Sequence, residues 1–195
     1  MSAAGSQDFV GKVPELRGKN YTHLLGFNEP DNAGQSNMNV SYALDLWPQL
    51  EAAGLPLGSP GCTEGGTFSW LREFMAGARE RKLRVDFLAL HWYGDCTKPA
   101  TLGSFLQQAH DEFKMPMWLT EFSCMRGDAA LNARFLHAAL PILAGAAGLQ
   151  RYAWFADRWP SDGSIYQGVS LLDAAGRLTV VGDIYSAKVS AGEGA

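Results

Sequence analysis

The chain has 195 residues, 47% of them hydrophobic, and its 16 Lys and Arg against 20 Asp and Glu give a net charge of −4. We expect a chain of this size to form one domain over residues 1–195 with a sizeable core. The charged residues form no basic block, which argues against nucleic acid as a partner. No apolar stretch reaches the roughly 18–20 residues of a membrane-spanning helix. Residues 1–8 also lack the charged start and apolar run of a signal peptide.

Strand and helix patterns alternate along the chain from residue 21 onward. Short apolar runs predict strands over residues 21–27, 55–59, 85–92, 116–120 and 149–155. Apolar residues at helical spacing predict helices over residues 43–50, 70–78, 102–113, 128–143 and 179–189, after a short helix near Val13 and Leu16. We expect Gly54 to cap the first long helix and Pro141 to kink or split the fourth.

This alternation predicts an α/β fold built from parallel βαβ units with right-handed crossovers. The predicted strands start about 30 residues apart, close to the roughly 31 residues per unit of a (β/α)8 TIM barrel. A doubly wound open sheet is the competing architecture, but no Gly-rich phosphate loop follows any strand, and Gly65-Gly66 is better explained as a turn. Five units do not close an eight-stranded barrel. We therefore expect an incomplete barrel in which about three N-terminal units are missing.

Polar residues gather at the carboxyl ends of the predicted strands, where α/β folds place their active sites. Asn28 and Glu29 follow the first strand, where Pro30 tends to stop the ladder, and Glu121 follows the fourth. The two glutamates lie 92 residues apart, which is three repeats of the unit. In a barrel they would face one another across its mouth. Two facing carboxylates in a cleft lined by aromatic residues are the machinery of glycoside hydrolysis.

Three motifs at these strand ends resemble one known family. They are Gly26-Phe27-Asn28-Glu29-Pro30-Asp31, Ala89-Leu90-His91-Trp92-Tyr93-Gly94 and Trp118-Leu119-Thr120-Glu121-Phe122. Together they resemble glycoside hydrolase family 128, a group of retaining endo-β-1,3-glucanases with (β/α)8 barrels. The stretches Gln35–Met38, Gly58–Pro60 and Trp70-Leu71 support the match, which covers most of residues 21–157.

The resemblance implies roles that spacing alone does not give. Glu29 would be the acid/base at the end of strand 4, and Glu121 the nucleophile at the end of strand 7. Asn28 would hydrogen-bond the 2-hydroxyl of the sugar. The chain would then hold strands 4 to 8 of the barrel, and strands 1 to 3 would be missing.

Other residues at the strand ends are candidates for substrate binding. His91 and Tyr93 share one face of their strand, so we expect Tyr93 to orient Glu121, with His91 as a support or as an ordinary core histidine. Trp92, Trp154 and Trp159 are predicted sugar platforms, with Asp157 beside them, whereas Trp47 and Trp70 fall on helical faces and are better explained as core. The four histidines show no ligand spacing, so no metal site is expected.

Cys62, Cys96 and Cys124 each follow the end of a successive predicted strand. By position, Cys96 could pair with either of the others, and the resemblance favours Cys96–Cys124. A disulfide there fits the extracellular or cell-wall location that the family implies. The alternative is three reduced thiols in a bacterial cytosolic protein.

We expect a monomer that binds β-1,3-glucan and uses no cofactor, and that binds neither nucleic acid nor a membrane. The alternatives are an inactive glucan-binding fragment of a barrel, or a retaining hydrolase of another β-glucan or a galactan.

Overall fold

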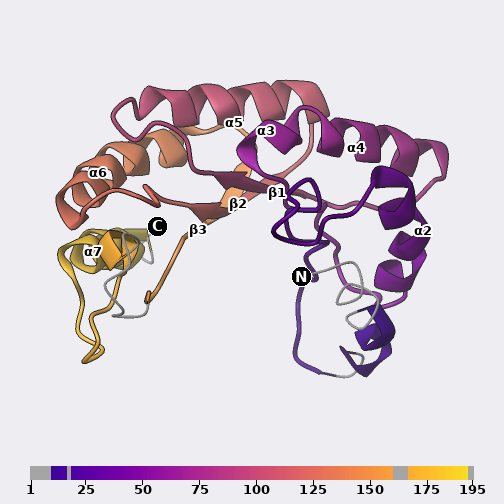
Figure 1. The fold of residues 1–195 in the computed structure, drawn as a ribbon, viewed down its shortest axis with the longest axis horizontal. Helices are drawn as coiled ribbons and strands as arrows, with labels where there is room; N and C mark the ends of the chain where they lie inside the picture. The colour runs from indigo at the N-terminus through magenta and orange to yellow at the C-terminus, as the bar shows by residue number, and fades with distance from the viewer. Residues whose placement is uncertain (1–9, 17–18, 160–166, 193–195) are drawn as a thin grey trace. The chain divides into compact units, whose positions relative to one another are not determined.

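The computed structural model describes residues 10–16, 19–159 and 167–192 (Figure 1). Its residues form two compact units. The first contains the chain up to His91 together with Phe113–Thr120, and the second contains Trp92–Glu112 and the chain from Glu121 onward. The boundary between the units falls inside the strands that end at residues 92 and 122. The residues at the strand ends are therefore divided between the two units.

Parallel strand segments are the framework of the fold. Strands β1 (Leu88–Trp92), β2 (Met117–Phe122) and β3 (Leu149–Trp154) form a three-stranded parallel sheet in the order β1-β2-β3 (Figure 1). They fall within the strands predicted at 85–92 and 149–155 and extend the one predicted at 116–120 to Phe122. All five residues of β1 are buried, as expected for a parallel strand that is covered on both faces.

The first two predicted strands are present only as isolated parallel bridges. Leu24 pairs with Leu57 and Asn28 with Gly61, while Gly58 and Cys62 pair with Phe87 and Leu90 of the next segment. The ladder is interrupted because Pro56 and Pro60 have no N–H group to donate. The order and direction predicted for these segments are nevertheless confirmed.

Helices of the first unit are η1 (Val13–Leu16), α2 (Val40–Glu51), α3 (Glu64–Thr67) and α4 (Trp70–Glu80). The Asn39 side chain caps α2 by accepting a hydrogen bond from the Tyr42 amide. The C-cap of α2 is Ala52 and not Gly54, so the predicted capping residue is wrong; Gly54 lies two residues further on, with φ +72°, and its amide donates to the carbonyl of Glu51. Helices α2 and α4 pack together through Trp47 and Phe74, whose ring centroids are 4.8 Å apart. Trp47 is therefore core, as predicted.

Helices of the second unit are α5 (Ala100–Phe113), α6 (Ala129–Gly145), η2 (Gln167–Val169) and α7 (Val180–Gly192). Asp128 caps α6 by accepting a hydrogen bond from the Leu131 amide. The helix continues through Pro141 as one element of 17 residues, so the predicted split is wrong. Phe135 of α6 packs against Trp92 and Trp154, and α7 packs against α6. No helix among the described residues is long and apolar enough to cross a membrane.

A disulfide and a buried asparagine fix the loops that follow β1 and β2. Cys96 and Cys124 are bonded to each other, which confirms the pairing that the family resemblance implied, and Cys62 is a free, buried thiol. The carboxamide of Asn132 accepts a hydrogen bond from the Cys124 amide and donates to the carbonyls of Cys124, Gly127 and Asp128. Because Asn132 is fully buried, these bonds satisfy polar groups that cannot reach water.

Removing the disulfide should lower the stability of the second unit. The bridge spans 28 residues, and the loss of loop-closure entropy from the unfolded chain corresponds to about 3–4 kcal/mol. We expect the Cys96→Ala, Cys124→Ala double variant to lose about that much free energy of unfolding in urea titrations. Cys62→Ala is the matched control because it removes a buried thiol and leaves the bridge intact. A double variant as stable as this control would contradict the prediction.

Candidate active site

Glu29 stands where the first parallel segment ends. Its amide donates a 2.6 Å hydrogen bond to the carbonyl of Gly61, which continues the bridge between Asn28 and Gly61. The backbone then turns sharply, because Glu29 has φ +40°. A residue with a Cβ atom rarely adopts this left-handed region, and such strain is concentrated at functional positions. The side chain is only 8% exposed, so its carboxylate needs partners within the protein.

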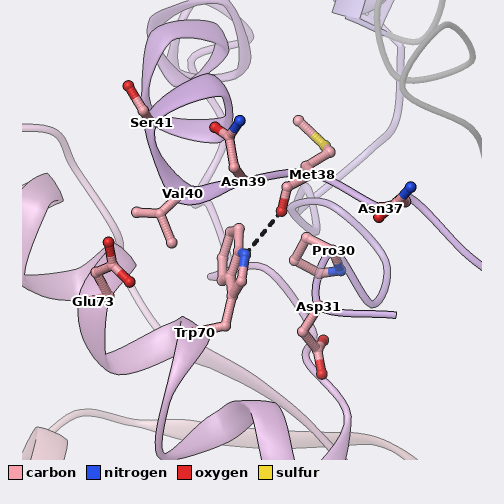
Figure 2. Close-up of a pocket in the computed structure, with 9 residues that line it drawn as sticks. All are labelled: Pro30, Asp31, Asn37, Met38, Asn39, Val40, Ser41, Trp70 and Glu73. Carbon is pink, nitrogen blue, oxygen red and sulfur yellow. Dashed lines mark hydrogen bonds between the residues drawn. The ribbon is translucent and has the colours of Figure 1, made fainter. Parts of the chain in front are cut away.

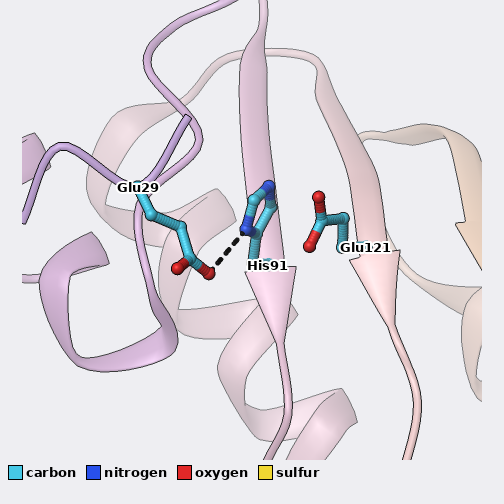
Figure 3. A group of neighbouring side chains, drawn as sticks. All are labelled: Glu29, His91 and Glu121. Carbon is cyan, nitrogen blue, oxygen red and sulfur yellow. Dashed lines mark hydrogen bonds and ion pairs between the residues drawn. The ribbon is translucent and has the colours of Figure 1, made fainter. Parts of the chain in front are cut away.

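Each carboxylate oxygen of Glu29 has one hydrogen-bond donor. Nδ1 of His91 lies 3.1 Å from Oε1 (Figure 3), and Nδ2 of Asn32 donates to Oε2 at 2.8 Å. The hydrogen bond from His91 lowers the pKa of Glu29, burial opposes it, and the bond from Asn32 lowers the pKa further. The net effect holds the pKa below its usual value, so these partners favour the ionised carboxylate.

His91 is held in this position by its own surroundings. It lies on β1, is 3% exposed, and its Nε2 edge faces Gly61 so closely that a Cβ atom there would lie 2.8 Å away. A contact this short leaves room only for glycine. His91 is buried and bonded to Glu29, and its predicted contact with substrate stays a prediction. The contact with Glu29 fits the supporting role that was also predicted for it.

The loop over residues 31–39 folds back onto the end of the first segment. The amide of Met38 donates to the carbonyl of Pro30 at 2.8 Å, and Nδ2 of Asn28 donates to Oε1 of Gln35 at 3.3 Å. On the other side, the carboxylate of Asp31 accepts hydrogen bonds from the amide and hydroxyl of Thr63. These hydrogen bonds fix the backbone on which Asn28 and Glu29 lie.

Glu121 is the carboxylate of the second unit. It is the penultimate residue of β2, is half-buried, and its Oε2 accepts a 2.6 Å hydrogen bond from the hydroxyl of Tyr93. This is the contact that the predicted orienting role of Tyr93 requires. Cys96 and Cys124 each lie three residues beyond one member of this pair, so their disulfide joins the two loops that carry it.

The predicted sugar platforms differ in their accessibility. Trp92 is fully buried and stacks on Phe135 with ring centroids 5.2 Å apart, because alternation along β1 turns it away from the face of Tyr93. Trp154 is also buried, and its Nε1 donates to the carbonyl of Val169 at 2.7 Å. These two predictions are therefore wrong. Trp159 is half-buried and Asp157 is exposed, so both remain accessible to a ligand.

The sequence did not single out Asn32 or the surroundings of Trp70. Asn32 follows Glu29 by three residues, and its amide donates to the Glu29 carbonyl at 3.0 Å. That is a turn geometry, which the loop composition after Pro30 could have suggested. Trp70, predicted as core, is half-buried and lines an open hollow of about 530 Å³ with Pro30, Asp31, Asn37 and Glu73 (Figure 2).

Comparison with known proteins gives a consistent set of relatives. A family model described as "Glycosyl hydrolase catalytic core" matches residues 2–185. The alkali-sensitive linkage protein 1 of Schizosaccharomyces pombe is 32% identical over 175 residues, or 83% of this chain. The chain spans only 32% of the length of that curated relative.

Solved structures of glycoside hydrolase family 128 are similar to this chain. A family 128 subgroup I endo-β-1,3-glucanase variant from Amycolatopsis mediterranei, in complex with laminarihexaose, is 36% identical with a TM-score of 0.79, and the match covers 92% of this chain and 76% of that one. A subgroup III curdlan-specific exo-β-1,3-glucanase from Blastomyces gilchristii, in complex with glucose, is 28% identical with a TM-score of 0.71. The match covers 94% of this chain and 76% of that one.

Replacing His91 should raise the pKa of Glu29, because its hydrogen bond is the largest contribution that lowers it. We expect the His91→Leu variant to show this shift in an NMR titration of side-chain carboxyl carbons, with the Glu29 resonance assigned from a Glu29→Gln sample. His23→Gln is the control, since His23 contacts Thr22 and not Glu29. An unchanged Glu29 titration in a folded His91→Leu protein would refute the assignment of this hydrogen bond as the main cause.

Proposed function

Because the chain belongs to the glycosyl hydrolase catalytic core family, and within it to glycoside hydrolase family 128, we propose that it hydrolyses β-1,3-glucan with retention of anomeric configuration. The observation that carries the proposal is the pair of glutamates at strand ends, each held by its own hydrogen bonds. Glu29 is bonded by His91 and Asn32, and Glu121 by Tyr93. The similar glucanases were solved with laminari-oligosaccharides or glucose, which supports this substrate class.

In the proposed reaction, Glu121 attacks the anomeric carbon as an ionised carboxylate, and Glu29 donates a proton to the departing glycosidic oxygen. A covalent glycosyl-enzyme forms, and Glu29 then takes a proton from the water that hydrolyses it. The Tyr93 hydroxyl holds one oxygen of Glu121 and so limits its rotation. Asn28 binds the 2-hydroxyl of the sugar, as the family resemblance implies.

The two roles of Glu29 make opposite demands on its protonation. The first step needs the proton on Glu29, whereas the second needs the ionised base. Its lowered pKa in the free protein favours the ionised form. The protonated form is therefore populated mainly at acidic pH, and kcat/KM falls as the pH rises through this pKa.

We further infer that residues 1–195 form a single catalytic domain and that its strand segments correspond to strands 4–8 of a (β/α)8 barrel. The order of the parallel segments and the likeness to family 128 structures over most of the chain support this assignment. We propose that the protein acts outside the cell or in the cell wall, because a disulfide persists in an oxidising environment.

The two glutamates should be distinguishable by their leaving-group dependence. We expect Glu29→Ala to lower kcat on laminarin by roughly 10²–10⁴-fold, because the leaving oxygen loses its acid. The same variant should retain most of its glycosylation rate on an aryl β-laminaribioside, whose phenolate leaves without protonation. Glu121→Ala should lose both activities, because its nucleophile is absent.

The measurements are the pre-steady-state burst of phenolate release, which reports the first step alone, and the initial rate of reducing-sugar release from laminarin, for both variants and the unmodified chain. Glu80→Ala replaces an exposed glutamate at the end of α4 and is the control for an effect of substitution alone. If the unmodified chain released no oligosaccharide from laminarin, the proposed substrate would be wrong. If Glu29→Ala and Glu121→Ala lost the aryl substrate equally, the assignment of roles would be wrong.

A further inference from the structure

The side chain of Asn32 contacts the Glu29 carboxylate and is not used by the reaction described above. Asn32 is half-buried in the loop over residues 31–39, and its Nδ2 donates a hydrogen bond to Oε2 of Glu29 at 2.8 Å. Glu29 is only 8% exposed, so the free energy of its charged form depends on the few donors that reach it. What holds Asn32 in place therefore decides whether a donor is always present at Oε2.

Hydrogen bonds hold Asn32 at both its backbone and its side chain. The Asn32 amide donates to the Glu29 carbonyl at 3.0 Å, and the Asn32 carbonyl accepts from the Gln35 amide at 3.0 Å. The side-chain oxygen Oδ1 of Asn32 accepts from the Gly34 amide at 2.9 Å. Asn32 thus joins two consecutive turns of one short loop, and these turns set its position relative to Glu29.

The contact with Gly34 determines which end of the Asn32 carboxamide faces Glu29. A backbone amide can only donate, and an ionised carboxylate can only accept. With Oδ1 toward Gly34 and Nδ2 toward Glu29, both contacts are satisfied. The reverse orientation would place two donors together and two acceptors together. Asn32 is therefore held as a donor to Glu29, and rotation of its carboxamide would cost both hydrogen bonds.

A fixed donor at Oε2 acts differently on the two protonation states of Glu29. It stabilises the negative charge that appears on Glu29 once its proton has passed to the leaving oxygen, because hydrogen bonds to an ionised group are the stronger ones. It has less effect on the protonated acid. His91 differs from Asn32, because Nδ1 of an imidazole can either donate or accept. The Asn32 contact therefore favours the base form that the second step requires.

We propose that Asn32 is a positioning residue of the acid/base, which holds Oε2 of Glu29 in place and stabilises the carboxylate formed in the first step. This inference rests on the proposed function, since it takes Glu29 as the acid/base. Asn32 acts through Glu29 and not through contact with substrate. Its removal should therefore move the pH dependence of the reaction, which a purely structural role would leave in place.

Other titratable groups near Glu29 in the first unit are His91, Asp31 and Cys62. Asp31 accepts hydrogen bonds through its own carboxylate. Burial raises the pKa of the Cys62 thiol far above its usual value, so this group stays neutral. These three residues, and Glu121 of the second unit, are the same in every variant compared. A difference that follows substitution at position 32 therefore reports the contact with Glu29.

Two substitutions of Asn32 test the proposal. Asn32→Ala removes the donor, and Asn32→Asp keeps an oxygen for the Gly34 amide but turns a second carboxylate toward Glu29. Both changes disfavour the ionised Glu29, so its pKa rises and the protonated acid persists to higher pH. On laminarin we expect the alkaline limb of kcat/KM to move up by about 0.5–1 pH unit for Asn32→Ala. For Asn32→Asp we expect about 1 unit or more.

Asn37→Asp is the matched control for Asn32→Asp. It adds the same charge to the same loop at an exposed position, and aspartate tolerates the φ of +45° found there. Urea unfolding shows which variants are folded, and partial unfolding would lower kcat/KM at every pH without moving the limb. An unmoved limb in the folded Asn32 variants, or an equal movement in Asn37→Asp, would overturn the proposal.

An NMR titration separates the failure of this inference from that of the proposed function. The side-chain carboxyl carbon of Glu29 is followed in the unmodified chain and in Asn32→Ala, whether or not laminarin is hydrolysed. We expect its midpoint to rise by about 0.5–1 pH unit in the variant. If the midpoint rises but laminarin is not cleaved, the proposed substrate is wrong and the action of Asn32 on Glu29 is supported. If laminarin is cleaved and the midpoint is unchanged, the positioning role of Asn32 is wrong.

Discussion

The hydrogen bond between His91 and Glu29 is the interaction on which the first half of the site depends. It supplies a partner for the buried Glu29 carboxylate, whose backbone is strained. It is also the largest contribution that lowers the pKa of Glu29. It also limits the local sequence, because a side chain at Gly61 would displace the imidazole. The same contact fixes the orientation of this buried carboxylate and favours its ionised form.

The second unit fixes its carboxylate by a different device. Tyr93 holds Glu121 by one hydrogen bond, and the Cys96–Cys124 disulfide joins the loops that follow these two residues. Asn132 then ties the Cys124 loop to helix α6 through four hydrogen bonds. Glu29 is thus held by side chains close to it, whereas the surroundings of Glu121 are stabilised by a covalent bond and a buried polar network.

Local patterns in the sequence predicted the order of strands and helices, since apolar spacing and turn residues are properties of short segments. The same reasoning found Glu29, Glu121 and the Tyr93 contact, because strand ends gather at one edge of a parallel sheet. It failed for Trp92 and Trp154, whose burial depends on packing against Phe135 and Phe122 from distant parts of the chain. It also missed Asn32 and the exposure of Trp70, which depend on how the 31–39 loop folds back.

In the proposed reaction, Glu121 is the nucleophile and Glu29 the acid/base of a retaining hydrolase. Its most direct test is to trap the covalent intermediate with a 2-deoxy-2-fluoro laminaribiosyl fluoride, which forms the glycosyl-enzyme readily and hydrolyses slowly. Peptide mass spectrometry of the labelled protein then locates the sugar. We expect one adduct, on the peptide that contains Glu121. An adduct on Glu29, or turnover of laminarin with no adduct and with inverted products, would contradict it.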